Sequence, residues 1–174
     1  LGLNNTSVKA ANDASFANNT APDASKIYLG NWGDLNANGS DFICYSFAEK
    51  QGYSKFGSYK GNDLADGTFC YTGFKPAFVM IKKSSQVGDW LMCDNKRNNY
   101  SLPSTQNNFN VVNGKIFPNT DQAEEFYDSF DFLSNGFKMR TTSGSINASG
   151  QPYIYMAFAE APLVGTNNVP ATAR

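Results

Sequence analysis

The sequence contains no histidine in its 174 residues. Without an imidazole there is no Ser-His-Asp or Cys-His catalytic pair, no histidine-ligated zinc site and no histidine-based pH switch. Charge of either sign is also scarce, since 14 Lys and Arg residues stand against 15 Asp and Glu residues for a net charge of −1. This balance lacks the excess of positive charge with which proteins neutralise nucleic-acid phosphates. We therefore expect neither a histidine-dependent enzyme nor a nucleic-acid partner.

Cysteines and long hydrophobic runs are equally limited. Cys44, Cys70 and Cys93 are far apart in the sequence and form no CxxC pair, which argues against a disulfide framework and a zinc ribbon. The longest apolar stretch, residues 153–159, is far shorter than the roughly 20 residues of a membrane-spanning helix. Phosphate-binding, dinucleotide-binding and calcium-binding loop motifs are missing as well. We expect no membrane insertion, no cofactor and no bound metal.

Aromatic residues are abundant, with 14 Phe, 9 Tyr and 2 Trp, and they recur in short apolar runs separated by Gly, Asn, Asp and Ser. This pattern is typical of β-strands joined by turns. It predicts an all-β fold, an antiparallel β-sandwich of jelly-roll type. The expected strands are residues 26–29, 42–48, 54–59, 68–73, 77–83, 90–94, 129–133, 137–142 and 153–159.

Three local signals add detail to this expectation. The tripeptide Ser-Asn-Gly at residues 134–136 predicts a tight hairpin, because Asn-Gly tolerates the positive φ of such turns. Asp121 as an N-cap, with Glu124 three residues later, predicts one short helix near residues 121–128. The polar, Asn-rich residues 95–120 are expected to form the longest loop, and long loops often carry binding functions.

The sequence contains an internal repeat. Residues 34–49 read DLNANGSDFICYSFAE and residues 145–160 read SINASGQPYIYMAFAE, and the two copies align at one constant offset without a gap. Seven of the sixteen positions are identical. A spacing of about 110 residues fits a sandwich domain, because the repeats of solenoid proteins are only about 20–50 residues long.

The repeat predicts units in tandem. Residues 1–49 are expected to be the last part of a preceding β-sandwich unit, residues 50–160 a complete unit, and residues 161–174 an extended tail. Because the chain starts at Leu1 without a methionine, we expect it to begin inside a longer polypeptide. The alternative is a chance similarity between two hairpins rich in Asn and Gly.

Sugar recognition is the binding function that the residue types favour. Sugar sites combine an aromatic platform for the apolar face of the ring with polar groups that bind its hydroxyls. Two groups offer this mixture: Trp90 with Asp94, Lys96 and Arg97, and Trp32 with Asn31 and Asp34. The alternative is that both tryptophans pack in the core or in an interface.

Carboxylate pairs are the catalytic chemistry that remains, as in glycoside hydrolysis. Glu49 and Glu160 end the two copies of the repeat, but a residue repeated at a repeated position is better explained as structural. Asp89 and Asp94 lie five residues apart and therefore on opposite faces of one predicted strand. We expect no enzyme and assign no catalytic residue.

Four stretches carry a family resemblance: FAEKQGYSKFGSY at residues 47–59, YTGFKPAFVM at 71–80, DFLSNGFK at 131–138 and YIYMAFAEAP at 153–162. They are similar to a domain of unknown function that is widespread in virion proteins of tailed bacteriophages. The resemblance points especially to marine phages that infect cyanobacteria and abundant ocean heterotrophs. In that family the unit occurs in tandem and beside concanavalin-like lectin modules. The resemblance implies a virion structural role and brings no catalytic residues.

The resemblance leaves three functions open. The first is a tail fibre, spike or other appendage on the virion exterior, a homotrimer that contacts other virion proteins and adheres to host-surface glycans. The second is a capsid-exterior decoration or head-fibre protein that acts through protein–protein contacts. A glycan depolymerase that uses carboxylates is a minor third.

Overall fold

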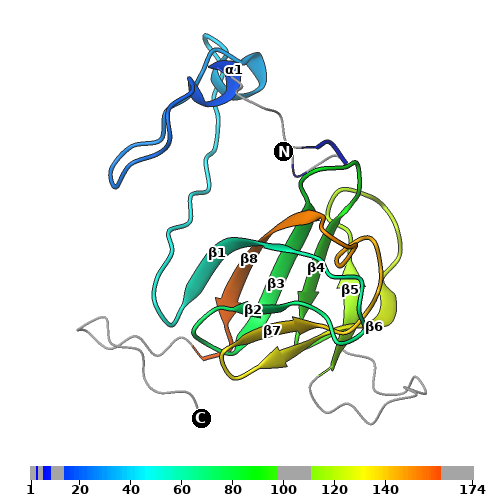
Figure 1. Ribbon diagram of the computed structural model, residues 1–174. Helices are drawn as coiled ribbons and strands as arrows, with labels where there is room; N and C mark the ends of the chain where they lie inside the picture. The colour runs from blue at the N-terminus through cyan, green and yellow to red at the C-terminus, as the bar shows by residue number, and fades with distance from the viewer. Residues whose placement is uncertain (1–2, 4–5, 9–13, 98–110, 162–174) are drawn as a thin grey trace. The chain divides into compact units, whose positions relative to one another are not determined.

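The computed structural model describes residues 3, 6–8, 14–97 and 111–161, and the chain forms two compact units. The first unit comprises Leu1–Val8 and Ala48–Arg174, and the second comprises Lys9–Phe47. Among its described residues the second unit carries two short helices, α1 (Ala14–Ala17) and α2 (Gly33–Asn36) (Figure 1). Every strand that the structure describes lies in the first unit.

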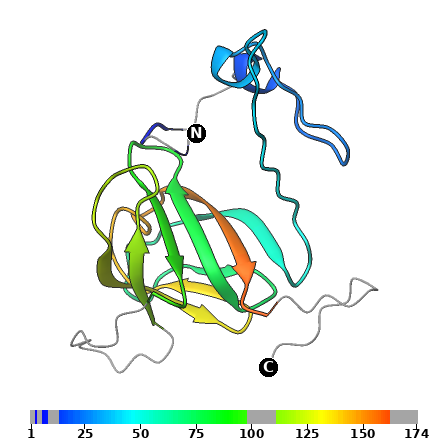
Figure 2. The same cartoon turned by 180° about the vertical axis from the view of Figure 1, so that it is seen from behind.

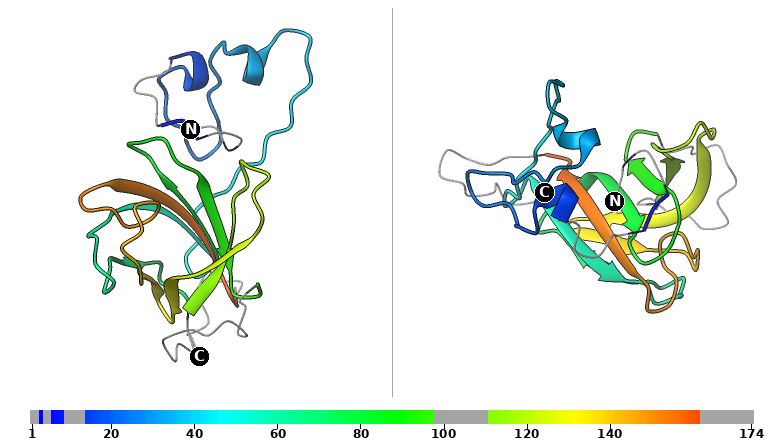
Figure 3. Two further views of the ribbon diagram at one scale, coloured as in Figure 1. Left: turned by 90° about the vertical axis from the view of Figure 1, so that its right-hand side faces the viewer. Right: turned by 90° about the horizontal axis from the view of Figure 1, so that it is seen from above.

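The first unit is built on one antiparallel sheet of eight described strands in the order β1-β8-β3-β4-β5-β6-β7-β2. The sheet curls until it is nearly closed into a barrel, as Figures 1 and 2 show from opposite sides and Figure 3 shows from the side and from above. The strands are β1 (Ser54–Lys60), β2 (Phe69–Tyr71), β3 (Pro76–Lys83), β4 (Trp90–Asp94), β5 (Val111–Ile116), β6 (Glu125–Leu133), β7 (Gly136–Met139) and β8 (Pro152–Ala159).

Strand β8 is a central strand, because it pairs with β1 on one side and with β3 on the other. Its alternate residues Tyr153, Tyr155 and Ala157 are buried, whereas the residues between them are half-buried. This alternation is the period of two that a strand with one face on the core requires. The Tyr153 ring stacks on Tyr59 of β1 with the ring centroids 5.0 Å apart.

An aromatic core fills the inside of the curled sheet. Phe130 of β6 and Phe137 and Met139 of β7 are fully buried. Phe137 meets Tyr155 edge to face, with ring centroids 5.1 Å apart. Burying side chains of this size contributes about 1.5–3 kcal/mol each to folding, so the core stabilises the closed form of the sheet.

The predicted antiparallel β class is confirmed, because the described chain is nearly all-β, but the two short helices of the second unit differ from the expectation of at most one helix near residues 121–128. All seven strands expected after residue 50 are present, with their ends displaced by a few residues. The expected hairpin is confirmed as well, because Leu133 pairs directly with Gly136 across a two-residue turn. The arrangement differs from the expected jelly roll: the described strands form one nearly closed sheet, so the sandwich is not confirmed.

The helix expected near residues 121–128 is wrong. Residues 121–124 are not helical, and β6 begins at Glu125. Glu125 pairs in register with Lys115 of β5, and the two side chains form an ion pair of 3.2 Å. The aromatic residues that follow have a strong preference for strands, and pairing with two neighbouring strands outweighs a lone capping signal.

The loop expected over residues 95–120 is interrupted by β5 (Val111–Ile116), a strand that the sequence reading missed. Residues 98–110 of that loop lie outside the described residues, as do residues 162–174 of the tail predicted over residues 161–174. None of the helices in the described parts of the chain is long and apolar enough to cross a membrane.

The strands expected at residues 26–29 and 42–48 are not present. Residues 42–47 lie in the second unit and are exposed along their whole length. A strand needs hydrogen-bonded neighbours, and none of the eight described strands pairs with residues 42–46. The division into tandem units stays a prediction.

Candidate functional site

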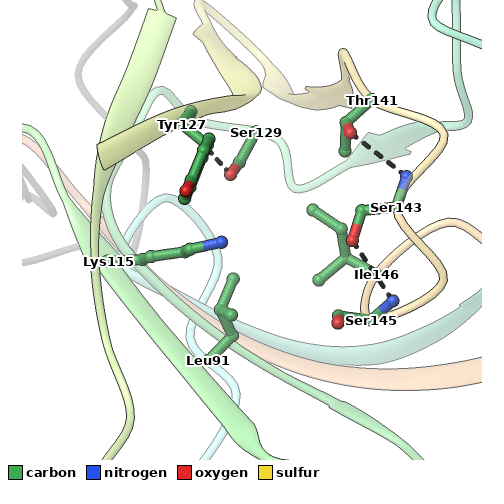
Figure 4. Close-up of a pocket in the computed structure, with 8 residues that line it drawn as sticks. All are labelled: Leu91, Lys115, Tyr127, Ser129, Thr141, Ser143, Ser145 and Ile146. Atoms are coloured by element: carbon green, nitrogen blue, oxygen red, sulfur yellow. Dashed lines mark hydrogen bonds between the residues drawn. The ribbon is translucent and has the colours of Figure 1, made fainter. Parts of the chain in front are cut away.

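A pocket of about 280 Å³ opens beside the core of the first unit. Three strands and one loop line it, as Figure 4 shows. Its volume lies just below the roughly 300–1,000 Å³ typical of small-molecule sites. The lining residues are Leu91 of β4, Lys115 of β5, Tyr127 and Ser129 of β6, and Thr141, Ser143, Ser145 and Ile146 of the loop between β7 and β8.

Lys115 is the cation among the residues that line this pocket. Its Nζ lies 3.2 Å from Glu125 Oε2 and 4.9 Å from the centroid of the Tyr127 ring. The side chain is only 14% exposed, so the ammonium is less screened by water than a surface lysine. An ammonium held between a carboxylate and an aromatic face has a fixed position before any ligand arrives.

Hydroxyl groups form the opposite wall of the pocket. Ser129 Oγ donates to the carbonyl of Tyr127 at 3.0 Å. Thr141 Oγ1 accepts from the Ser143 backbone N–H at 3.1 Å, and Ser143 Oγ accepts from the Ser145 N–H at 3.4 Å. In Figure 4 Thr141, Ser143 and Ser145 lie across the open space from Lys115 and Tyr127, whereas Ser129 lies beside Tyr127. Such hydroxyls can both donate to and accept from a polyhydroxylated ligand.

The loop that carries this wall is held by buried polar groups. Asn147 is fully buried, and its Nδ2 donates to the carbonyls of Thr141 at 2.8 Å and Leu64 at 2.9 Å. The Tyr59 hydroxyl donates to the Ile146 carbonyl at 2.6 Å, and the Tyr153 hydroxyl donates to the Gly144 carbonyl at 2.8 Å.

Burial raises the pKa of Tyr59 well above its ordinary value, so the Tyr59 hydroxyl keeps its proton and its bond across the whole physiological range. Burial also raises the pKa of Tyr153. The hydrogen bonds from these two hydroxyls hold the loop between β7 and β8 in one conformation.

The arrangement is suited to binding. One cation, one aromatic ring and several hydroxyls fit a small hydroxylated ligand that carries a negative charge. The described residues contain no cluster of three or more His, Cys, Asp or Glu side chains that could hold a metal ion.

The structure brings three of the residues predicted for sugar binding together at the end of β4. Asp94 Oδ1 accepts the backbone N–H groups of Lys96 at 2.8 Å and Arg97 at 3.0 Å. Arg97 Nε donates to Asp94 Oδ2 at 2.6 Å, and its Nη1 lies 3.2 Å from Glu124 Oε1. Burial alone would raise the pKa of Asp94, but these hydrogen bonds and the Arg97 charge hold that pKa below its ordinary value. The Asp94 and Arg97 side chains are thus already engaged with each other.

The two tryptophans lie in different surroundings. Trp90 begins β4 and is buried, and four residues of strand place it about 13 Å from Asp94. Trp90 therefore gives the Asp94 group no aromatic platform. Trp32 lies in the second unit and is 44% exposed, next to Asp34 in α2. The proposal of sugar binding at Trp32 and Asp34 stays a prediction.

None of the residues that line the pocket is predicted as a site by the sequence. Lys115 falls within the stretch that was expected to be a loop, and Tyr127 within the expected helix. The available signal was the alternation of residues 111–117 and 125–133, which marks two strands that can pair and place Lys115 beside Tyr127.

A family model described as "Domain of unknown function (DUF7483)" matches residues 1–162. The chain belongs to this family. The expectation of a family without an established function is thereby confirmed. No curated protein and no solved structure matches the chain. Its pocket must therefore be interpreted from its own chemistry.

Proposed function

We propose that this chain is a structural protein of a tailed-phage virion, part of a tail fibre, spike or other exterior appendage, and that it adheres to host-surface glycans through the pocket around Lys115. The observation that carries the adhesive role is one pocket that unites the Lys115 ammonium, the Tyr127 ring and a wall of hydroxyls. The virion setting rests on the resemblance of the sequence. In this setting the chain works as a homotrimer attached to other virion proteins.

The chemistry of the pocket favours an acidic sugar. A carboxylate on the sugar would share the Lys115 ammonium with Glu125, which engages one of its three N–H donors. The sugar hydroxyls would exchange hydrogen bonds with Ser143 and Ser145. The exposed ring of Tyr127 offers an apolar face on which a pyranose can stack. The volume of about 280 Å³ suits one sugar unit at the end of, or within, a longer glycan.

A second candidate is a capsid-exterior decoration or head-fibre protein that acts through protein–protein contacts. The observation in its favour is the exposure of large apolar side chains in the second unit, with Ile43 82%, Tyr45 81% and Phe47 61% exposed. Immunogold labelling of intact particles separates the two candidates, because label over the head supports decoration and label over the tail supports adhesion.

The adhesive role is tested by titrating the chain with glucuronate and with glucose. The variant Lys115→Met keeps most of the apolar stem and loses the charge. A charge-assisted hydrogen bond contributes about 1.5–3 kcal/mol, so the variant should bind glucuronate about 10-fold or more weakly. Binding of glucose, which lacks the carboxylate, should change far less.

Lys96→Met is the matched control, because Lys96 is exposed and lies in the group first predicted from the sequence. It should leave glucuronate binding unchanged. Loss of binding in Lys96→Met but not in Lys115→Met would place the sugar at the end of β4 and overturn the pocket as the site.

A further inference from the structure

The two copies of the sequence repeat share one side-chain hydrogen bond in detail. Asn36 Nδ2 donates to the carbonyl of Gly30 at 2.9 Å. Asn147, the equivalent of Asn36 in the second copy, donates from Nδ2 to the carbonyl of Thr141 at 2.8 Å. Thr141 is likewise the equivalent of Gly30 when the repeat offset is extended upstream. The repeat therefore reproduces a contact between equivalent positions.

The backbone of the two copies agrees as well. Gly39 and Gly150, which are equivalent in the repeat, both have a left-handed conformation, with φ of 77° and 69°. Three backbone hydrogen bonds recur at the same offset: Leu35 N to Trp32 O and Ile146 N to Ser143 O, Asn36 N to Trp32 O and Asn147 N to Ser143 O, and Ser40 N to Ala37 O and Gln151 N to Ala148 O. A chance similarity of composition does not explain a shared turn of this length.

The copies diverge immediately after this turn. Residues 152–159 form β8, which is flanked by β1 and β3. The equivalent residues 41–48 are exposed, and the described structure assigns them no strand. Ile43 is 82% exposed, whereas its counterpart Ile154 is half-buried. The turn that precedes a strand is thus present in both copies, but none of the described strands pairs with residues 42–46.

We propose that residues 42–47 are the closing strand of a second copy of this curled sheet, in which they take the place that β8 takes in the first unit. The partner is a repeat unit of the same fold that presents strands of the β1 and β3 type with the place between them open. The match of the preceding turn, residue by residue, identifies this partner, because it is the turn that delivers β8 to its place between β1 and β3.

The known register gives the orientation of the segment in that sheet. Residues 42, 44 and 46 take the buried positions of Tyr153, Tyr155 and Ala157. Ser46 would lie opposite the partner's equivalents of Lys55 and Val79, since Ala157 pairs with these residues. Ile43, Tyr45 and Phe47 take the half-buried outer face. In this position these three side chains lose part of the apolar surface that they now expose to water.

Asn36 gains partners in the same way. In the first unit Asn147 also donates to Asn62 Oδ1 and to the carbonyl of Leu64, in the loop that follows β1. The equivalent loop of the partner unit would supply these acceptors to Asn36. Cys44 is smaller than Tyr155, so the core of the partner unit must fill that space with other side chains.

The test is a longer chain in which residues 48–144 are followed directly by residues 34–174. Because the repeat has no gap, this join puts residue 34 where residue 145 stands in the first unit. Residues 42–47 should then close the added sheet. Hydrogen exchange at the amides of residues 43–47 should slow at least about 100-fold relative to the 174-residue chain.

Two variants of the longer chain serve as controls. Exchanging residues 40–47 for the sequence of residues 151–158 provides a closing strand of known fit, and its amides should be protected. Ser46→Asp places a charge at the position equivalent to the buried Ala157, so it should abolish the protection in the longer chain. In the 174-residue chain, where this segment is exposed, the same change should have no effect. Protection in the exchanged chain but none in the longer chain with Cys44→Tyr, which fills the space that Tyr155 occupies in the first unit, would overturn the proposal.

A second measurement uses the natural assembly. Cys44 is exposed in this chain, whereas Cys70 and Cys93 are buried, and burial raises the pKa of Cys70 to about 12. Cys44 is therefore the thiol that a labelling reagent should reach first. In the assembly purified from its source it should react at least about 10-fold more slowly than in the isolated chain, because closure buries it. Equal rates would contradict the proposal.

Discussion

Replacing Asn147 by Ala is expected to lower the free energy of unfolding of the first unit by roughly 3–5 kcal/mol, because several buried groups lose their partners at once. The Asn147 side chain has no exposed surface. It donates to the carbonyls of Leu64 and Thr141, and its Oδ1 accepts the Asn62 N–H at 3.0 Å. Urea unfolding followed by near-ultraviolet circular dichroism measures the loss.

Asn36→Ala is the matched control for this prediction. Asn36 is the equivalent residue of the repeat and makes the equivalent hydrogen bond to Gly30, but it is exposed. Its replacement should change the unfolding free energy by no more than about 1 kcal/mol, since water can satisfy the groups it leaves. Equal losses in the two variants would contradict the view that only the second copy of the repeat is closed into a sheet.

Replacing Phe137 by Ala is expected to cost about 3–5 kcal/mol, the range for truncating a fully buried aromatic residue. Phe137 has no exposed surface and meets Tyr155, Phe130 and Tyr59 with ring centroids 5.1, 6.1 and 6.4 Å apart. These residues belong to four different strands, so the cavity would weaken the sheet where it curls. The same urea titration checks this expectation.

Phe69 of β2 provides the control for the aromatic core. It is 43% exposed and lies on the neighbouring strand, where it pairs with Lys138. Phe69→Ala should cost less than about 1.5 kcal/mol, because much of its ring is already in water. A loss at Phe69 as large as that at Phe137 would mean that the core lies elsewhere.

The hairpin between β6 and β7 could be predicted because its signal is local. Ser134 and Asn135 form the turn and Gly136 begins β7, so the tripeptide marks the hairpin although neither Asn135 nor Gly136 has the positive φ expected of an Asn-Gly turn. The flanking Phe132 and Phe137 pair in register. The helix expected near residues 121–128 failed for the opposite reason. Its capping signal was also local, but Glu125 pairs with Lys115 across a stretch that the sequence presented as a loop.

Residues 42–47 also show that a local sequence signal does not by itself determine secondary structure. Their sequence is as strand-like as that of β8, yet a strand is completed by neighbours that the segment itself does not encode.

The pocket could not be predicted from single residues either. Lys115, Tyr127 and Thr141 come together only through the register of β5 and β6 and the loop held by Asn147. Trp90, one of the two aromatic residues that the sequence offered for sugar binding, is buried, as the alternative of core packing expects.

Locating a bound acidic sugar on the chain tests the proposed adhesive role of the Lys115 pocket most directly. Nuclear Overhauser effects between the ring protons of glucuronate and the aromatic protons of the chain report which side chains lie within a few ångströms. We expect contacts with Tyr127, lost in Lys115→Met and kept in Lys96→Met. Contacts with Trp32 in place of Tyr127 would contradict the account and move the adhesive site to the second unit.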